Sequence, residues 1–327
     1  MTDQAVLVTG GAGYIGSHVV RHLRRDGERV VVLDDLTTGF AEAVGDAALV
    51  QGDVGDRETV RRVLNEYGVD TVMHFAAHTK VPESVTDPLK YYRNNTRNTQ
   101  RLLEVCLECG VRRVVFSSTA AVYGEVEGEE AREDSPLAPI NPYGRSKLAA
   151  EWLLEDLDTA GELTHVSLRY FNVAGSAPDG GIGQSTPNAT LLVKVAAEAA
   201  TGRRDGVDVF GTDYPTQDGT CIRDYIHVED LADAHVLALK HLRSGGESLT
   251  LNCGYGHGYS VLDVLRAVER VQGESPTIRY APRRAGDPAR LVANADRIRE
   301  QLGWQPQYDD LDAIVRTAID WEEHRRY

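Results

Sequence analysis

The sequence is poor in cysteine, in long apolar runs and in basic residues. Four cysteines among 327 residues are too few for the disulfide scaffold of a small secreted domain. The 35 basic and 50 acidic residues give a formal charge of -15, which excludes an overall attraction to nucleic acid or an anionic membrane but allows a local basic patch. No run approaches the roughly 20 apolar residues of a membrane span, and no secretory leader precedes the first strand-like segment. We therefore expect a cytoplasmic protein.

Cys106 and Cys109 match the Cys-x-x-Cys pattern, but their position does not suit redox or zinc chemistry. They end a helical pattern just before Gly110, where the helix dipole opposes thiolate formation. No second cysteine pair and no histidine cluster completes a zinc site. We expect no bound metal.

Short strand-like runs alternate with helical patterns over the first half of the chain. The strand-like runs lie at 6–10, 29–33, 49–53, 70–76, 112–118 and 165–171, and the helical patterns at 57–67, 89–109 and 143–157. This alternation predicts an α/β fold with a Rossmann-type doubly wound parallel sheet. Past Asn172, loops rich in glycine and proline indicate a smaller mixed α/β C-terminal lobe. We expect one domain over 1–172, with returns near 221–253, and a second over 173–327.

Gly10, Gly13 and Gly16 follow the first strand and open a helical pattern. Glycines there let the backbone turn sharply and approach a pyrophosphate, which binds the free amides at the helix N-terminus. The second strand ends at Asp34 and Asp35, where a carboxylate is expected to accept hydrogen bonds from an adenosine ribose. Two acids without a neighbouring arginine should repel a 2′-phosphate, so the sequence favours NAD over NADP.

Asp53 closes the third strand-like run and has two interpretations. It could reach the adenine of the same cofactor. An isolated aspartate after a strand is, however, usually a cap of the next helix.

Tyr143 and Lys147 lie four residues apart at the start of a helical pattern. At that spacing both side chains share one helix face, so the ammonium should lower the pKa of the phenol from its ordinary value of about 10. The hydroxyl cluster 117–119 shortly precedes the pair. The arrangement predicts a proton-transfer group that works near neutral pH.

Arginines gather in the loop-rich second half of this acidic chain. They suggest local binding of a polyanion such as a diphosphate, although salt bridges to neighbouring acids would explain about half of them. The residues are Arg203, Arg204, Arg223, Arg283 and Arg284.

Six motifs together resemble the extended short-chain dehydrogenase/reductase family, and within it the nucleotide-sugar epimerases. The motifs are T-G-G-A-G-Y-I-G at 9–16, F-S-S-T-A-A-V-Y-G at 116–124, N-P-Y-G-x-S-K at 141–147, L-R-Y-F-N-V-A-G at 168–175, D-G-T-C-I-R-D-Y-I-H-V at 218–228 and A-P-R-R-A-G-D-P at 281–288. The resemblance implies C4 epimerisation of a UDP-hexose, UDP-galactose to UDP-glucose, through a transient 4-keto sugar with NAD. It makes Tyr143 the general base, has Lys147 bind the nicotinamide ribose, and has Thr119 hydrogen-bond the sugar oxygen.

The resemblance also implies a set of ligand contacts and a homodimer formed by helices near 97–109 and 143–157. The implied cofactor residues are Gly10, Gly13, Tyr14, Ile15, Gly16, Asp34, Asp35, Thr38, Asp53, Val54, Phe75, Ala76, Ala77, Asn94, Ser117, Tyr143, Lys147 and Tyr170. The implied UDP-sugar residues are Thr119, Tyr143, Asn172, Leu192, Phe210, Arg223, Arg284, Asp287 and Leu291.

Some positions depart from the family pattern. Asp35 replaces the usual asparagine, and Leu191 and Lys194 replace residues that the family uses near the uracil. Leu291 is intermediate in size between a tyrosine and a cysteine that, in the family, are thought to set the room for an N-acetyl group. The sequence therefore leaves open whether N-acetylated sugars are accepted.

Other activities on the same scaffold stay open too. A pentose or uronate substrate and a catalytically silent NAD sensor are alternatives. Dehydratases and decarboxylases rank lower, because Ala120 and Ala121 stand where related dehydratases carry acids.

Overall fold

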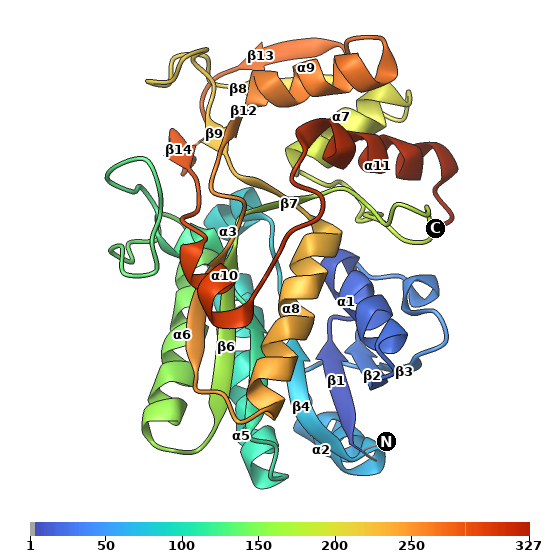
Figure 1. Ribbon diagram of the computed structural model, residues 1–327, viewed down its shortest axis with the longest axis vertical. Helices are drawn as coiled ribbons and strands as arrows, with labels where there is room; N and C mark the ends of the chain where they lie inside the picture. The colour runs from blue at the N-terminus through green and yellow to red at the C-terminus, as the bar shows by residue number, and fades with distance from the viewer. Residues whose placement is uncertain (1–3, 285) are drawn as a thin grey trace.

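The computed structural model describes residues 4–284 and 286–327. Its main element is a seven-stranded parallel sheet with the strand order β11-β6-β5-β4-β1-β2-β3 (Figure 1). The strands are β1 (Ala5–Thr9), β2 (Arg29–Asp34), β3 (Ala48–Gln51), β4 (Val69–His74), β5 (Arg113–Ser117), β6 (Thr164–Tyr170) and β11 (Leu249–Cys253). β11 comes from far along the chain and forms one edge of the sheet beside β6. The predicted Rossmann-type parallel sheet is confirmed.

The central strand β1 is buried on both faces, which explains its continuous apolar sequence. Val6 and Val8 pack into one core cluster, whereas Ala5 and Leu7 pack into another. This division follows from the two-residue period of a strand. Both faces of the sheet therefore require a cover.

Helices supply that cover on both sides (Figure 1). α1 (Tyr14–Arg25) and α8 (Val228–Arg243) pack together over the face of Val6 and Val8. α2 (Arg57–Tyr67), α5 (Asn98–Glu108) and α6 (Pro142–Thr159) contribute to the clusters on the other side. None of the helices within 4–284 and 286–327 is both long and apolar enough to cross a membrane.

The second part of the molecule contains short strands in small sheets and three helices that pack on one another, at the top of Figure 1. β7 pairs with β10, β8 pairs with β13, and β9 pairs with β12 and β14. The strands are β7 (Asn172–Ala174), β8 (Val207–Phe210), β9 (Ile222–Arg223), β10 (Tyr225–His227), β12 (Tyr259–Ser260), β13 (Ile278–Ala281) and β14 (Arg290–Leu291), and the helices are α7 (Leu192–Ala200), α9 (Val261–Gln272) and α11 (Leu311–His324).

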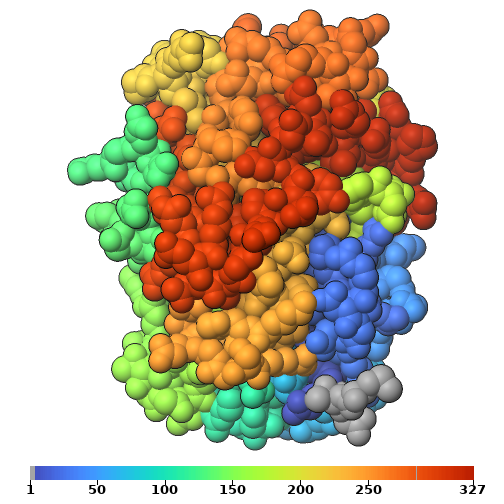
Figure 2. Space-filling view, viewed as in Figure 1, coloured from blue at the N-terminus to red at the C-terminus, as the bar shows by residue number. Residues whose placement is uncertain are grey.

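The C-terminal segment runs between the two parts. α10 (Asp296–Leu302) contacts α8 and β11, whereas α11 packs on α7 and α9. In the space-filling view this segment, in red, lies across the surface from the sheet to the second part (Figure 2). Two short helices, α3 (Val81–Thr86) and α4 (Pro88–Tyr91), precede a π-helical turn at Tyr92–Arg97.

Candidate active site

The carboxyl ends of the central strands bring the predicted cofactor residues together. The Gly10 amide donates to the Leu33 carbonyl at 2.9 Å, and the Phe75 amide donates to the Thr9 carbonyl at 2.9 Å. The turns after β1, β2 and β4 therefore lie side by side. Ligands of open α/β sheets collect at this edge.

The glycine turn leaves no room for side chains at two of its three positions. A Cβ on Gly10, which has φ +71°, would lie 2.6 Å from the Ala76 nitrogen, and one on Gly16 would lie 2.3 Å from the Gly10 oxygen. At Gly13 the nearest such contact is 3.3 Å. No side chain caps the start of α1 and no acid lies in its first turn, so its amides are available to an anion. This cradle fits the pyrophosphate of a dinucleotide.

Asp34 ties the glycine turn to the loop after β2. Its buried carboxylate accepts hydrogen bonds from the amides of Ala12 and Leu36, both at 2.9 Å. Burial raises the pKa of Asp34. Asp35 is exposed and instead accepts from the amide of Thr37 at 2.9 Å and from its hydroxyl at 2.6 Å. The two acids thus have different positions, and Asp34 faces the turn.

Asp53 makes the contacts of a loop-capping residue. It accepts from the Gly55 amide at 2.7 Å and from the Asn98 side chain at 3.2 Å. It also lines a hollow of about 460 Å³ together with Arg93 and Arg97. Asp53 does not cap the next helix, because Asp56 is the N-cap of α2, and a contact of Asp53 with adenine stays a prediction.

The other predicted cofactor residues surround the same edge. Tyr14 donates to the Gly175 carbonyl at 2.6 Å, and the hydroxyls of Ser117 and Tyr170 are 2.7 Å apart. Asn94 lies in the π-helical turn, a distortion that is frequent at functional sites. Val54 is buried, Ile15, Phe75, Ala76 and Ala77 are half-buried, and Thr38 is exposed.

Tyr143 and Lys147 enter the site from the first turns of α6. Asn141 caps this helix by accepting from the Gly144 amide at 2.9 Å, and Pro142 occupies its first position. The Tyr143 hydroxyl is hydrogen-bonded to Thr119, which follows β5. The Lys147 ammonium donates to the Ser117 carbonyl at 2.8 Å and is buried. The three predicted catalytic side chains are therefore brought together.

The predicted lowering of the Tyr143 pKa is wrong for this arrangement. Burial raises the pKa of Tyr143, and the hydrogen bond with Thr119 opposes that rise. Burial also lowers the pKa of Lys147 to about 7, so near neutral pH the lysine is only partly charged. Helical spacing alone could not reveal that both groups are enclosed.

Apart from Thr119 and Tyr143, the predicted UDP-sugar residues come from the second part of the molecule. The Arg223 guanidinium lies 3.9 Å from the Asp287 carboxylate, and the Arg284 guanidinium lies 3.6 Å from the centre of the Phe210 ring. Ala285, between these elements, lies outside the described residues.

Three other predicted UDP-sugar residues lie at the ends of short strands and of a helix in the second part. Asn172 begins β7, and its backbone amide donates to the Asp224 carbonyl at 2.9 Å. Leu192 begins α7. Leu291 pairs with Arg223 and packs against the cluster that contains Ala120, beside the catalytic loop.

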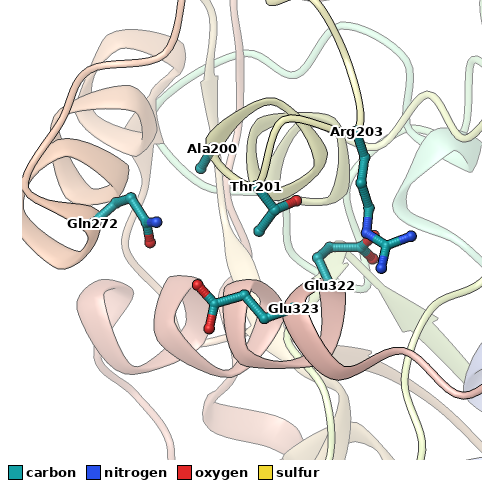
Figure 3. Close-up of a pocket in the computed structure, with 6 residues that line it drawn as sticks. All are labelled: Ala200, Thr201, Arg203, Gln272, Glu322 and Glu323. Atoms are coloured by element: carbon teal, nitrogen blue, oxygen red, sulfur yellow. The ribbon is translucent and has the colours of Figure 1, made fainter.

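Four of the five noted arginines lie within 4 Å of an acid. Besides Arg223, which adjoins the predicted Asp287, they are Arg204, 2.8 Å from Glu198, Arg283, 2.7 Å from Asp213, and Arg203, 3.9 Å from Glu322 (Figure 3). Arg203 and Glu322 also line the hollow of about 390 Å³ in Figure 3, which contains none of the residues that the family resemblance implies. Arg284, which has no acidic partner among the described residues, and Arg223, whose acidic neighbour is itself a predicted contact, remain the better candidates for a diphosphate.

Two buried residues that the sequence reasoning missed support the site. Asn95 accepts from the His78 amide at 2.9 Å and donates to the Ser146 hydroxyl at 3.0 Å, which fixes α6 against the π-helical turn. Asp224 accepts from three backbone amides in the loops around β9, and burial raises its pKa to about 6. Neither residue has a local signal in the sequence, because Asn95 lies in the polar run 93–100 and Asp224 directly follows the charged Arg223.

The Cys-x-x-Cys pair lies away from this edge. Cys106 is buried in the core that α2 and α5 share, and burial raises the pKa of its thiol to about 12. Burial also raises the pKa of Cys109. Both thiols are thus poor nucleophiles.

Comparison with known proteins gives close matches over nearly the whole chain. UDP-glucose 4-epimerase of Azospirillum brasilense is 59% identical over 98% of this chain and 94% of its own. The structure of UDP-glucose 4-epimerase from Bifidobacterium longum in complex with NAD+ and UDP is 37% identical with a TM-score of 0.94, covering 98% of this chain and 99% of that one. The UDP-Glc/GlcNAc 4-epimerase of Campylobacter jejuni is 48% identical with a TM-score of 0.85 and the same coverage.

A family-level match agrees with these relatives. The family model of NAD dependent epimerases and dehydratases matches residues 6–254, which include the glycine turn, Tyr143 and Arg223. The resemblance expected from the motifs is confirmed. With a site of this geometry and relatives this similar over their full length, the chain belongs to the NAD dependent epimerase/dehydratase family.

Proposed function

We propose that the protein is an NAD-dependent epimerase that inverts C4 of a UDP-hexose and interconverts UDP-galactose and UDP-glucose. The observation that carries the proposal is the meeting of Tyr143, Thr119 and Lys147 at the sheet edge where the glycine turn opens. The names of the full-length relatives support the same activity. The division into a cofactor part over 1–172 and a substrate lobe over 173–327 belongs to this proposal.

The residues at the edge fit a dinucleotide. The Gly10 turn and the α1 amides would hold its pyrophosphate, and Asp34 is placed for the ribose. Bound NAD would supply reversible hydride transfer at the sugar C4, and return of the hydride to the opposite face would invert that carbon with no net oxidation.

The chain's own side chains handle the proton. Once ionised, the Tyr143 oxygen takes the proton of the sugar 4-hydroxyl and later returns it to the same sugar oxygen, while the Thr119 hydroxyl orients that oxygen. Lys147 stabilises the phenolate whenever its ammonium is charged. Enclosure of these groups keeps water from the reacting atoms.

The nucleotide side anchors the substrate while the sugar turns over. Arg223 and Arg284 supply guanidinium donors for the diphosphate, and Phe210 offers an aromatic face beside Arg284. Asn172, Leu192 and Asp287 complete the proposed contacts. Lys194, which replaces a residue near the uracil in relatives, is buried and its ammonium is already engaged in an ion pair with Glu322.

A broader sugar specificity is the second candidate. Leu291 packs beside the catalytic loop, and the Campylobacter relative is named for both UDP-Glc and UDP-GlcNAc. Dehydration is disfavoured, because Ala120 and Ala121 leave no acid next to Thr119.

A homodimer has some support, whereas the cytoplasmic location stays a prediction. The exposed Trp152 lies on α6, one of the helices expected at the interface, and the exposed Leu89 and Tyr92 lie before the other, in α4 and in the π-helical turn. Trp152→Glu should then convert a dimer into a monomer in light scattering. An unchanged mass would argue against this interface.

The decisive experiment is incubation of the purified protein with UDP-galactose and no added NAD. Appearance of UDP-glucose without net NADH would support both the reaction and a retained cofactor. A dehydrated or decarboxylated sugar would overturn the reaction. Parallel incubation with UDP-N-acetylgalactosamine tests the broader specificity, which a negligible rate would reject.

A further inference from the structure

Three residues of α6, each one turn apart, face three consecutive residues at the end of β5. Tyr143 and Lys147 are the first two, and Glu151 is the third. The spacing of four residues places all three on one helix face. The pairs are Tyr143 with Thr119, Lys147 with Ser117, and Glu151 with Ser118. The helix and the strand end are thus fixed together at three successive points.

Glu151 is fully buried and held in place from a second strand. Arg169 of β6 donates to it from Nε, at 3.1 Å to each carboxylate oxygen, and from Nη2 at 2.6 Å. Arg169 in turn donates to the Tyr123 hydroxyl at 3.1 Å and to the Glu133 carbonyl at 3.2 Å. The Glu151 carboxylate therefore has a fixed position relative to both strands.

A buried ion pair is weak as a source of stability, since apolar residues of similar volume often serve as well. Its placement next to the catalytic pair gives it a different use. The Ser118 hydroxyl that donates to Glu151 stands between the Ser117 carbonyl, which holds Lys147, and Thr119, which holds Tyr143. A shift of Ser118 would move both contacts together.

We propose that Glu151 is a positioning residue for the proposed epimerase reaction, which fixes the Ser117–Thr119 segment against α6 and supports the charge of Lys147. This inference rests on the proposed function. Glu151 hydrogen-bonds only to Ser118 and Arg169 within 4–284 and 286–327, so it acts through its neighbours.

The charges around Lys147 agree with this role. Burial lowers the pKa of Lys147 to about 7, and the Glu151 carboxylate opposes that change. Of the other titratable groups, Tyr143 lies one turn away on α6, and His74 on β4 interacts with Lys147 and has its pKa lowered to about 3 by burial. Both are neutral near pH 7, which leaves Glu151, itself paired with Arg169, as the opposite charge that acts on Lys147.

Glu151→Gln tests the charge while it preserves the size of the side chain. We expect kcat to fall about tenfold. In the profile of kcat against pH, the alkaline limit should move down by about one pH unit. The KM for UDP-galactose and the NAD content should stay as in the wild type. Ser118→Ala should lower kcat but leave the alkaline limit in place, because it removes a contact and no charge.

A matched control separates this role from the general effect of a buried ion pair. Glu322 is also fully buried and pairs with Lys194, away from the catalytic residues. Glu322→Gln should lower the melting temperature without moving the pH profile. If Glu151→Gln folds poorly because Arg169 loses its partner, the double variant Glu151→Gln with Arg169→Gln serves instead, since it removes both charges. The alkaline limit of this double variant is still expected to lie below that of the wild type.

An unchanged pH limit and kcat in Glu151→Gln or in the double variant would overturn the inference. This failure is distinct from failure of the proposed function, because each variant is compared with wild-type protein that converts UDP-galactose to UDP-glucose. A wild type without that conversion would overturn both.

Discussion

The two sides of the site are built in different ways. On the cofactor side, the ends of long paired strands carry the glycine turn, and Asp34 is fixed by two backbone amides. On the substrate side, the two-residue strand β9 carries Arg223, 3.9 Å from its acidic neighbour, and Arg284 lies in the loop after β13. The first side is shaped by backbone and tolerates little change. The second relies on side chains from short elements, which offer guanidinium groups to a ligand.

Gly16→Ala should break the cofactor side most completely. The new Cβ would lie 2.3 Å from the Gly10 oxygen, which must move and close the cradle. We expect purified protein without NAD and without measurable turnover. The measurement is the NAD released on denaturation, together with the rate on UDP-galactose.

Gly27→Ala is the matched control. Gly27 lies after the end of α1 with a φ of +82°, and a Cβ there meets nothing within 4 Å, so NAD content should stay unchanged with a small loss of stability. Full NAD content in Gly16→Ala would contradict the assignment of the cradle.

Tyr143→Phe should separate chemistry from cofactor binding. Loss of the proton-transfer oxygen is expected to lower kcat by about 10² to 10⁴ fold, while NAD content and the melting temperature change little. The exposed Tyr280 offers a control, since Tyr280→Phe should leave turnover unchanged. A biological activity that survives Tyr143→Phe would favour the silent NAD sensor instead.

The contrast between the two sides of the site also explains which features the sequence could predict. Three local features predicted the fold and the site: the alternation of apolar runs with helical patterns, the glycine spacing and the Tyr143–Lys147 pair. The structure contains the fold that they predict. The pKa directions of Tyr143 and Lys147 depend on burial, which spacing does not report. The pairing of Lys194 with Glu322 joins residues 128 positions apart and has no local signal.

Arg284→Ala should weaken substrate binding and spare the cofactor side. Arg284 lies over Phe210 with its donors available, so its loss is expected to raise the KM for UDP-galactose about tenfold to a hundredfold. Its sequence neighbour is the control: Arg283 is already engaged with exposed Asp213, and Arg283→Ala should change KM less than threefold, or about 0.6 kcal/mol. Equal effects of the two changes would remove Arg284 from the diphosphate site.

Acid should destabilise the sheet side through its buried histidines. Burial lowers the pKa of His165 and of His235 to about 4, below the unfolded value of about 6.5. The unfolded chain therefore binds more protons between pH 6.5 and 4, and stability falls as the pH falls through that window. The raised pKa of Asp224, about 6, offsets part of the loss.

His165→Gln isolates one of these groups. The slope of unfolding free energy against pH between 6.5 and 5 should decrease by about 1 kcal/mol per pH unit, measured by urea unfolding at each pH. An unchanged slope would mean that His165 does not titrate differently on unfolding.

Leu291→Tyr should give the smallest effect and sharpen the description of the substrate side. Leu291 packs against the cluster of Ala120 and Phe171, next to the catalytic loop. The larger tyrosine side chain at this position would reduce the room beside the sugar. Size changes of this kind discriminate by roughly tenfold, so the ratio of rates on UDP-N-acetylgalactosamine and UDP-galactose should fall by about that factor. NAD content should not change, because β14 pairs with β9 and not with the large sheet. Equal losses on both sugars would instead show that Leu291 supports the catalytic loop and does not select the substrate.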